Sequence, residues 1–521
     1  MAKTLSGKVK QEETAKALYE RMKNDREPYV TRAQNCAKYT IPSLFPKDTD
    51  TGSTNYDTPY QSMGARGVNN IASKLMLALL PPNSPFFRFT LSDNVKADMA
   101  SQQGLQAKVE EALGGLERKI TKYIETHQIR VTIGEALKSL VVAGNALLYL
   151  PPKEGGIKLY KLNSYVLQRD ALGNVIRIVA VDKIAYAALP PDVQGMVSKG
   201  SEEIKPEQVF EIYTHVYLDE GTFYSYQEVE GETISSTEQS FPKDKTPWIP
   251  LRMVKIDGES YGRSFVEEYL GDLKSLEGLS KAIVEISAIC ANIVLLVNPN
   301  GITRVSRLAK AQPGEYVPGR AEDISALQLE KQYDLQVAKG TADAIEARLS
   351  YVFMLNSAVQ RQGERVTAEE IRYVAGELED TLGGIYSILS QELQLPLVRR
   401  LCTQLQSQGQ IPDMPEGTVE PSITTGLEAL GRGHDLNKLS MFLEYAMKLP
   451  EAAQRLKMDG LLTMIATSLG LDTSGLIKTD EELQQEMAEA QQAQMLQQAT
   501  PHLAKGMVDA AVPKQQQGGQ G

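Results

Sequence analysis

The spacing of apolar residues predicts three long helices in the second half of the chain. From Ser264 to Val297 apolar residues recur every three or four positions with no proline between them, as one face of a helix requires. At 1.5 Å per residue this helix would be roughly 50 Å long. A second run covers Leu335 to Leu355, and a third extends from Thr367 through Leu393.

Capping residues and helix breakers set the expected ends of these helices. Ser264 with Glu267, and Thr367 with Glu370, have the spacing of capping boxes, which favours a helix start at each serine or threonine. Asn298-Pro299-Asn300-Gly301 is a strong helix breaker and ends the first run. The segment 301–334 is short and irregular, and we expect a small β-containing insertion there.

The first half of the chain is predicted to be mostly helical up to residue 150. A helix runs from Thr14 to Gln34, and Ile71 to Leu80 forms a buried helix that stops at Pro81-Pro82. Gly134 to Leu150 reads as a helix that passes through Gly144-Asn145 into a buried strand.

Residues 156–256 change to the alternation of strands. Two hairpins are predicted, around Gly173-Asn174 and around Asp219-Glu220-Gly221, each flanked by Val, Ile, Tyr and Thr. At the other end of the chain, residues 411–420 resemble a linker, and short helices follow to about Leu469. The tail from Asp480 is rich in glutamine, so we expect it to be helical at first and disordered at its end.

Composition narrows the class of protein. The net charge of −11 excludes a generally basic nucleic-acid binder, so any contact with DNA must come from local basic positions. Cys36, Cys290 and Cys402 are too scattered for a zinc site or a disulfide framework, which favours a reducing compartment. The N-terminal residues contain no apolar core, so we expect neither a signal peptide nor membrane insertion.

One short motif suggests catalysis. GESYG, from Gly258 to Gly262, matches the G-x-S-x-G nucleophile elbow of serine hydrolases, which also need a histidine base and an acid. A glycine-rich turn between a strand and a helix explains the same letters. A serine hydrolase with Ser260 as nucleophile is therefore the alternative function. The histidines available to it are His127, His215, His434 and His502.

Other catalytic signatures are missing from the sequence. It contains neither a G-x-x-x-x-G-K-[ST] phosphate loop nor a G-x-G-x-x-G motif. It also lacks H-E-x-x-H and paired cysteines, so we expect no metal and no cofactor. The chain does not have the features of a nucleotide-driven motor.

A small polar loop lies between the second and third predicted helices. Its residues Gln360, Arg361, Gln362, Gly363 and Arg365 include two arginines and a glycine hinge. In a monomer such a loop tip is unremarkable. In a closed ring each arginine is repeated once per subunit and becomes a belt of charge. Periodicity alone does not decide whether such a belt faces an axis.

Long runs of the chain are similar to a known family. These runs are residues 19–48, 64–82, 256–277, 345–384 and 385–399. Through them the sequence resembles the portal proteins, or head-to-tail connectors, of T7-like short-tailed bacteriophages, and the likeness extends to about Gly475.

The resemblance implies an α+β, mainly helical portal fold with wing, stem, clip and crown, assembled as a dodecameric ring with a central channel. The implied regions are an N-terminal α/β wing (1–262), a first stem helix (263–297), a clip (298–334), a second stem helix (335–355), a tunnel loop (356–366), a long wing helix (367–410), a helical crown (411–478) and a glutamine-rich tail (479–521).

The resemblance also implies a role. The ring would sit at one vertex of the virion capsid after synthesis in the bacterial cytoplasm, and would pass double-stranded DNA during packaging and ejection. Expected partners are a terminase ATPase, tail adaptor and nozzle proteins, capsid and scaffolding proteins and internal core proteins. The tunnel-loop arginines are candidates for contact with DNA, and Arg304, Arg307 and Lys310 for contact between the clip and adaptors. A purely structural shell subunit is a third possibility.

Overall fold

The structure of the chain is a computed structural model. The described residues are 13–47, 49–82, 85–92, 95, 105–152, 156–198, 204–291, 295–312, 314–326, 332–355, 384–412, 417–423, 444 and 448. The chain divides into two compact units, Met1–Ala429 and Leu430–Gly521. All the elements below belong to the first unit. Of the crown expected at 411–478, only residues 411–412, 417–423, 444 and 448 are described, and the glutamine-rich tail lies outside the described residues.

The first helix, α1 (Ala15–Lys38), confirms the predicted helix and extends four residues beyond its expected end. The Thr14 hydroxyl caps its N-terminus by accepting from the Ala17 amide at 3.2 Å. The buried Glu228 carboxylate accepts from the Ala15 amide at 2.7 Å and compensates the positive end of the helix dipole. Glu228 comes from a strand far along the chain, so this contact joins α1 to the sheet beneath it.

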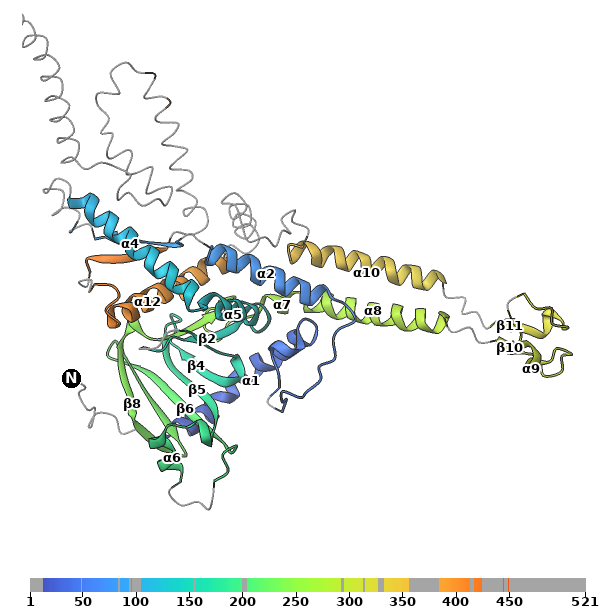
Figure 1. The fold of residues 1–521 in the computed structure, drawn as a ribbon, viewed down its shortest axis with the longest axis horizontal. Helices are drawn as coiled ribbons and strands as arrows, with labels where there is room; N and C mark the ends of the chain where they lie inside the picture. Colours follow the sequence, from blue (N-terminus) through green and yellow to red (C-terminus); the bar gives the residue numbers. More distant parts are fainter. Residues whose placement is uncertain are drawn as a thin grey trace, which may run out of the picture. The chain divides into compact units, whose positions relative to one another are not determined.

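That sheet is antiparallel and has five strands in the order β4-β5-β6-β7-β8 (Figure 1). The strands are β4 (Tyr165–Arg169), β5 (Val175–Ala185), β6 (Val209–Asp219), β7 (Thr222–Val229) and β8 (Glu232–Pro242). Both residues of the Glu220-Gly221 turn have positive φ, as a type I′ hairpin requires. The two predicted hairpins are confirmed. The short helix α6 (Pro191–Val197) lies between β5 and β6 along the chain.

The main core is built where three helices meet a second sheet. The helices are α2 (Met63–Leu79), α4 (Leu105–Thr126) and α5 (Ile129–Ala143), and the sheet pairs β2 (Asn145–Tyr149) with β3 (Lys158–Tyr160) and β9 (Trp248–Arg252). Gly144 has a φ of 75° and connects α5 directly to β2, which confirms the predicted passage from helix to strand. Short 3-10 turns lie at Pro42–Leu44, Leu162–Ser164, Tyr186–Ala188, Lys243–Lys245 and Ala321–Asp323.

Two distant segments form a strand pair that the sequence pattern did not indicate. The strand β1 (Phe87–Leu91) pairs antiparallel with β12 (Val419–Ile423). The prediction that 411–420 is a linker is therefore wrong for its last two residues, and the region expected as a helical crown starts with a strand. The physical reason is that an edge strand satisfies its backbone groups through a partner, and this partner is more than 300 residues away.

The first long helix is shorter than predicted and is interrupted. Instead of one helix from Ser264 to Val297, the structure has α7 (Phe265–Glu268), α8 (Leu270–Ala291) and the strand β10 (Leu295–Val297). The break falls at Tyr269, whose ring packs against Phe265 at a centroid distance of 5.2 Å. The apolar run at 295–297 pairs as a strand, and a short apolar run does not by itself distinguish helix from strand.

The second long helix agrees with the prediction. The helix α10 (Gln332–Val352) starts three residues earlier and ends three residues earlier than expected, and it lies beside α8 (Figure 1). Between them in the sequence, β10 pairs antiparallel with β11 (Ile324–Ala326), and α9 (Val305–Leu308) completes a small β-containing insertion, as predicted.

Only the end of the third predicted helix lies in the described residues. Its last part contains a π-helical turn at Ser390–Gln394 and then α12 (Leu395–Ser407). Pro396 occupies the first turn of α12, and the wider π turn comes immediately before it. A π turn is accommodated at this place because proline cannot donate the hydrogen bond of a regular helix.

The fold class is confirmed in its coarse form. Helices and strands are mixed, and more of the described residues lie in helices than in strands.

Candidate functional site

The predicted tunnel loop lies outside the described residues. Gln360, Arg361, Gln362, Gly363 and Arg365 all belong to it, and the capping box expected at Thr367 also lies outside the described residues. The described chain stops at residue 355 and resumes at residue 384. The role of these side chains therefore stays a prediction from the sequence.

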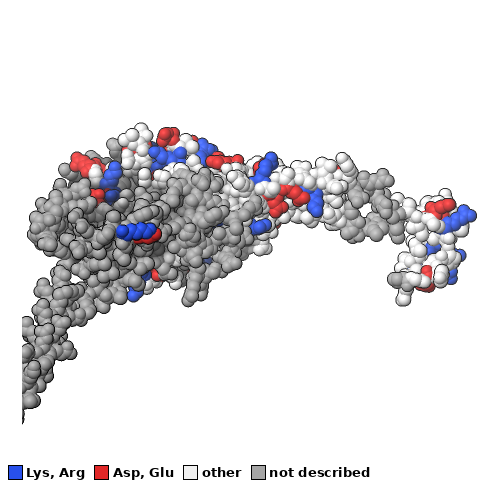
Figure 2. Space-filling model, turned by 90° about the horizontal axis from the view of Figure 1, so that it is seen from above, with Lys and Arg blue, Asp and Glu red and all other residues white. Residues whose placement is uncertain are grey.

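The three basic residues predicted for the clip are all exposed. Arg304 is the residue before α9, Arg307 lies within it, and Lys310 follows it. Figure 2 shows Lys and Arg side chains on this small lobe, at the right of the view, together with Asp and Glu side chains. Exposed apolar side chains accompany them, and Tyr316 is 100% exposed while Ile302 is 71% exposed. The described part of the insertion therefore exposes both charged and apolar side chains.

A buried polar contact holds together the insertion predicted as the clip. The Asp323 carboxylate accepts from the Thr303 amide at 3.1 Å and from the Thr303 hydroxyl at 2.8 Å. A Cβ on Gly301 would lie 2.5 Å from the Asp323 carboxyl carbon, so the glycine allows this close approach. Because these contacts cross from one end of the insertion to the other, α9 and its arginines are carried on an organised support.

The helix α10 carries two apolar stripes. The first is the predicted one, and its members Ala342, Ile345 and Leu349 are buried. The pair α8–α10 is further joined by Arg348, whose Nη2 donates to Asp272 at 3.1 Å. The second stripe occupies another side of α10 and is exposed along its whole length. Its members are Tyr333, Val337, Gly340, Ala344, Ala347 and Tyr351.

The exposed stripe was missed in the sequence although its signal is present there. Its members are spaced four, three, four, three and four residues apart, which is the repeat of a helix–helix seam. Small residues occupy its middle and tyrosines its ends, so a helix could approach closely at the centre. The neighbouring stripe of larger aliphatic residues dominated the pattern and masked it.

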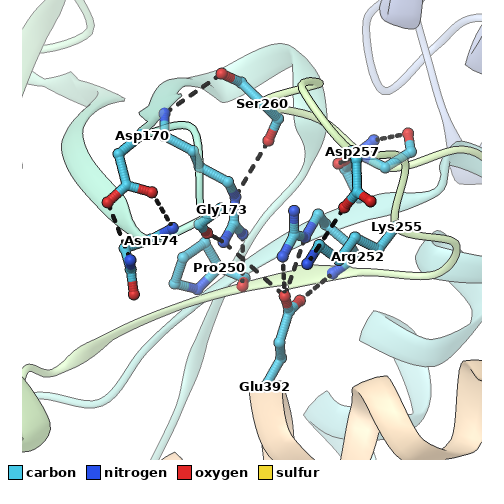
Figure 3. Close-up of polar contacts among 12 residues, drawn as sticks. Asp170, Gly173, Asn174, Pro250, Arg252, Lys255, Asp257, Ser260 and Glu392 are labelled. Carbon is cyan, nitrogen blue, oxygen red and sulfur yellow. Dashed lines mark hydrogen bonds and ion pairs between the residues drawn. The ribbon is translucent and has the colours of Figure 1, made fainter.

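The surroundings of GESYG do not support a nucleophile elbow. Residues 253–264 separate the strand β9 from the four-residue helix α7, whereas an elbow requires a sharp turn directly from strand to helix. The Ser260 hydroxyl accepts from the Arg169 amide at 3.3 Å, and its carbonyl accepts from the Arg169 side chain at 3.2 Å (Figure 3). Ser260 therefore helps to hold a loop against a hairpin.

The described histidines are engaged elsewhere. His127 stacks on the ring of Tyr123 at a centroid distance of 3.8 Å. His215 is buried in the sheet, where its Nδ1 lies 2.9 Å from the Tyr226 hydroxyl, and burial lowers the pKa of His215 to about 3. His434 and His502 lie outside the described residues. Within the described chain, the hydrolase alternative has no constellation to support it.

A buried charged cluster lies beside this loop (Figure 3). Glu392, in the π turn, accepts from the backbone amide of Arg252 at 3.0 Å and from two nitrogens of its guanidinium. Arg169 lies 3.9 Å from the same carboxylate, donates to the carbonyls of Gly173 and Pro250, and has a pKa lowered to about 10 by burial. The cluster ties the π turn to β9 and to the hairpin of β4 and β5.

The part of the chain that the structure describes contains no group of three or more His, Cys, Asp or Glu side chains placed to hold a metal ion. No described helix is both long enough and apolar enough to cross a membrane.

Comparison with known proteins identifies the family. The model of the family described as bacteriophage head to tail connecting protein matches residues 12–477. The portal protein of Escherichia phage T7 is 56% identical over 510 residues, covering 96% of this chain and 95% of the relative. The portal protein of Enterobacteria phage T3 is 57% identical over 480 residues, with 91% and 90% covered. That of Enterobacteria phage SP6 is 32% identical over 489 residues, with 92% of each covered. The chain therefore belongs to the family of bacteriophage head-to-tail connecting proteins.

Proposed function

We propose that this connector works as a dodecameric ring at one capsid vertex, and that double-stranded DNA passes through its centre during packaging and ejection. The family membership supports the role of connector, which is structural and not enzymatic. The ring, the channel and the docking partners go beyond family membership, and features of the single chain favour each of them.

The exposed stripe of α10 is the observation that most directly supports the proposal of a ring. An apolar stripe along five turns of helix is unfavourable in water, and about 25 cal/mol is gained for each Å² of apolar surface that a partner covers. The inner stripe already packs on the core of the same chain, so the outer stripe needs a second molecule. In a closed ring every subunit has a neighbour at the same place, and no subunit is left with its stripe in water.

The chemistry of the tunnel loop suits a conduit. DNA carries dense negative charge, and a protein that neutralised many phosphates would bind it tightly and stall it. This chain carries a net charge of −11, so a few basic belts at Arg361 and Arg365 would centre the duplex without gripping it. Gln360 and Gln362 would add weak contacts, and Gly363 would let the loop adjust.

The clip offers a docking surface for the packaging motor and later for the tail. Since the sequence contains no phosphate loop, the energy for packaging would come from a separate terminase ATPase. Arg304, Arg307 and Lys310 would contact acidic residues of that partner, and of tail adaptor and nozzle proteins after it leaves. Capsid, scaffolding and internal core proteins would contact other regions of the ring.

Assembly tests the proposal through the exposed stripe. The unmodified protein is expected to form a particle of several hundred kilodaltons with a central hole in negative-stain images. Ala344→Arg places a long charged side chain at the centre of the stripe, so this variant should remain near the monomer mass of 57.3 kDa. The matched control is Glu346→Arg, which introduces the same side chain at an exposed position on the other side of α10 and should still assemble.

Mass photometry distinguishes the outcomes. Rings formed by Ala344→Arg in the same yield as by the control would show that the stripe is not the interface. An unmodified protein that stays monomeric, or that forms closed shells and not isolated rings, would contradict the proposed function itself.

A further inference from the structure

The C-terminal end of α10 lies in a socket on α2. Phe353, the first residue after the helix, is fully buried, and its ring lies 6.0 Å from that of Phe265 and 6.3 Å from that of Tyr269. On the α2 side, a Cβ added to Gly67 would lie 2.4 Å from Cγ of Phe353. Only a glycine at that position lets the phenyl ring come so close to the helix.

Two polar side chains of α2 hold the backbone of the same residues. The Asn70 amide donates to the carbonyl of Phe353 at 2.8 Å and to the carbonyl of Met354 at 3.0 Å. The Lys74 ammonium donates to the Met354 carbonyl at 3.2 Å. Lys74 is only 6% exposed, which is rare for a lysine. Its charge lies at the negative end of the α10 dipole, where a cation is favourable.

The three socket residues share one side of α2. Gly67, Asn70 and Lys74 follow the spacing i, i+3 and i+7, which places them on a single helical face. Asn70 and Lys74 bind backbone carbonyls of the α10 end, and Gly67 receives the Phe353 ring. The α2 residues beside them, such as Ile71 and Leu75, are fully buried in the main core. The end of α10 is thus tied to the core.

The backbone conformation at the socket is unusual. Met354 has a φ of 53°, in the left-handed region that bulky side chains rarely adopt. Its amide donates to the Tyr351 carbonyl at 3.0 Å, and the Leu355 amide donates to the Ser350 carbonyl at 2.8 Å. These are the two bonds of a Schellman cap, whose left-handed position is usually glycine. Such strain persists only where surrounding contacts impose it, and it concentrates at functional sites.

We infer that Gly67, Asn70 and Lys74 are positioning residues that fix where, and in which direction, the chain leaves α10 toward Arg361 and Arg365. Because they hold the last described residues before the predicted tunnel loop, a shift of α10 against α2 would move the start of that loop. The inference about DNA rests on the proposed function, whereas the socket itself does not. This assigns to α2 a part in holding the packaged genome, although α2 itself need not touch DNA.

The test combines a local and a functional measurement on the assembled protein and on particles made with it. Asn70→Leu with Lys74→Met removes the donors and keeps the side-chain volume. Amide hydrogen exchange of a peptide covering Ser350 to Leu355 is expected to accelerate at least tenfold, and exchange in the five-stranded sheet should not change. Particles carrying the variant should retain severalfold less DNA at an unchanged ring mass. The matched control is Asn69→Leu, which changes the exposed neighbour of Asn70.

Each outcome decides a separate point. Unchanged exchange at 350–355 would overturn the socket. Faster exchange with normal DNA retention would overturn its positioning role. Faster amide exchange throughout the protein would show that Asn70 and Lys74 contribute only to general stability. If the double variant does not fold, Asn70→Leu alone is measured in the same way. A failure of the proposed function is recognised separately, because Arg361→Ala with Arg365→Ala would then leave DNA retention normal while the socket is intact.

Discussion

At the scale of single residues, Glu392 is the acidic partner of two buried arginines. It accepts from the backbone and the guanidinium of Arg252 and lies near Arg169, and both arginine side chains are only 5% exposed. Glu392→Gln would leave two buried guanidinium groups without a countercharge. Breaking a buried pair by removing one partner costs about 3–5 kcal/mol. We expect a decrease of that size in the free energy of unfolding, measured by urea denaturation.

An exposed ion pair provides the control for this prediction. Lys281 and Glu285 lie 3.9 Å apart on α8, and both side chains are more than half exposed. Glu285→Gln should change the free energy of unfolding by less than about 1 kcal/mol, because water screens such pairs. Similar losses in the two variants would contradict a special role for the buried cluster.

Single residues also show where sequence reasoning ends. The cap formed by Ser264 was predicted, and its hydroxyl accepts from the Glu267 amide at 2.9 Å. The Glu267 carboxylate, however, pairs with Arg263 and Arg32. In the sequence, Lys74 only interrupts the apolar run from Ile71 to Leu80. A charged residue on a helix normally faces solvent, and nothing local reveals that a carbonyl from a distant helix end will meet it.

At the scale of elements, Gly144 determines how α5 turns into β2. Its φ of 75° suits glycine, and an added Cβ would lie 2.5 Å from the carbonyl carbon of Arg263. Gly144→Ala therefore combines backbone strain with a clash against backbone that cannot move easily. We expect a loss of at least about 2 kcal/mol in the free energy of unfolding. Urea denaturation measures it.

A second glycine makes this prediction specific. Gly195 lies within α6, has no heavy atom near its missing Cβ, and is exposed. Gly195→Ala should stabilise the protein slightly, by about 0.5–1 kcal/mol, because alanine has the better helix propensity. If both substitutions had the same sign, the close approach at Gly144 would not be the cause.

Most element types were predictable, whereas element ends and the strands β10 and β12 were not. The period of apolar residues identified α10, the hairpins and the buried face of α8 because each is decided by burial on one side. The interruption at Tyr269 depends on aromatic packing with a residue some 80 positions away. The pairing of β1 with β12 likewise depends on a partner that local pattern does not name. Long-range contacts therefore account for most of the differences.

At the scale of the whole molecule, the two arginines of the predicted tunnel loop are the sequence feature with the largest expected effect. In a ring, Arg361→Ala with Arg365→Ala removes two positive charges from every subunit, and so two complete belts. Fewer phosphate contacts should weaken retention of DNA, and we expect severalfold more leakage from purified particles. Leakage from the unmodified particle should rise with salt concentration, because salt competes for phosphate contacts, and leakage from the variant should depend less on salt.

A surface arginine provides the reference. Arg21 is 63% exposed on α1, and Arg21→Ala removes one charge from every subunit without affecting the loop. Both variants should form rings of normal mass, so that any difference arises in the channel and not in assembly. Packaged DNA per particle and its release over time are the two quantities to measure. Equal retention in the two variants and the unmodified protein would show that DNA passes the ring without contact with Arg361 or Arg365, and the constriction would then have to be sought elsewhere along the channel.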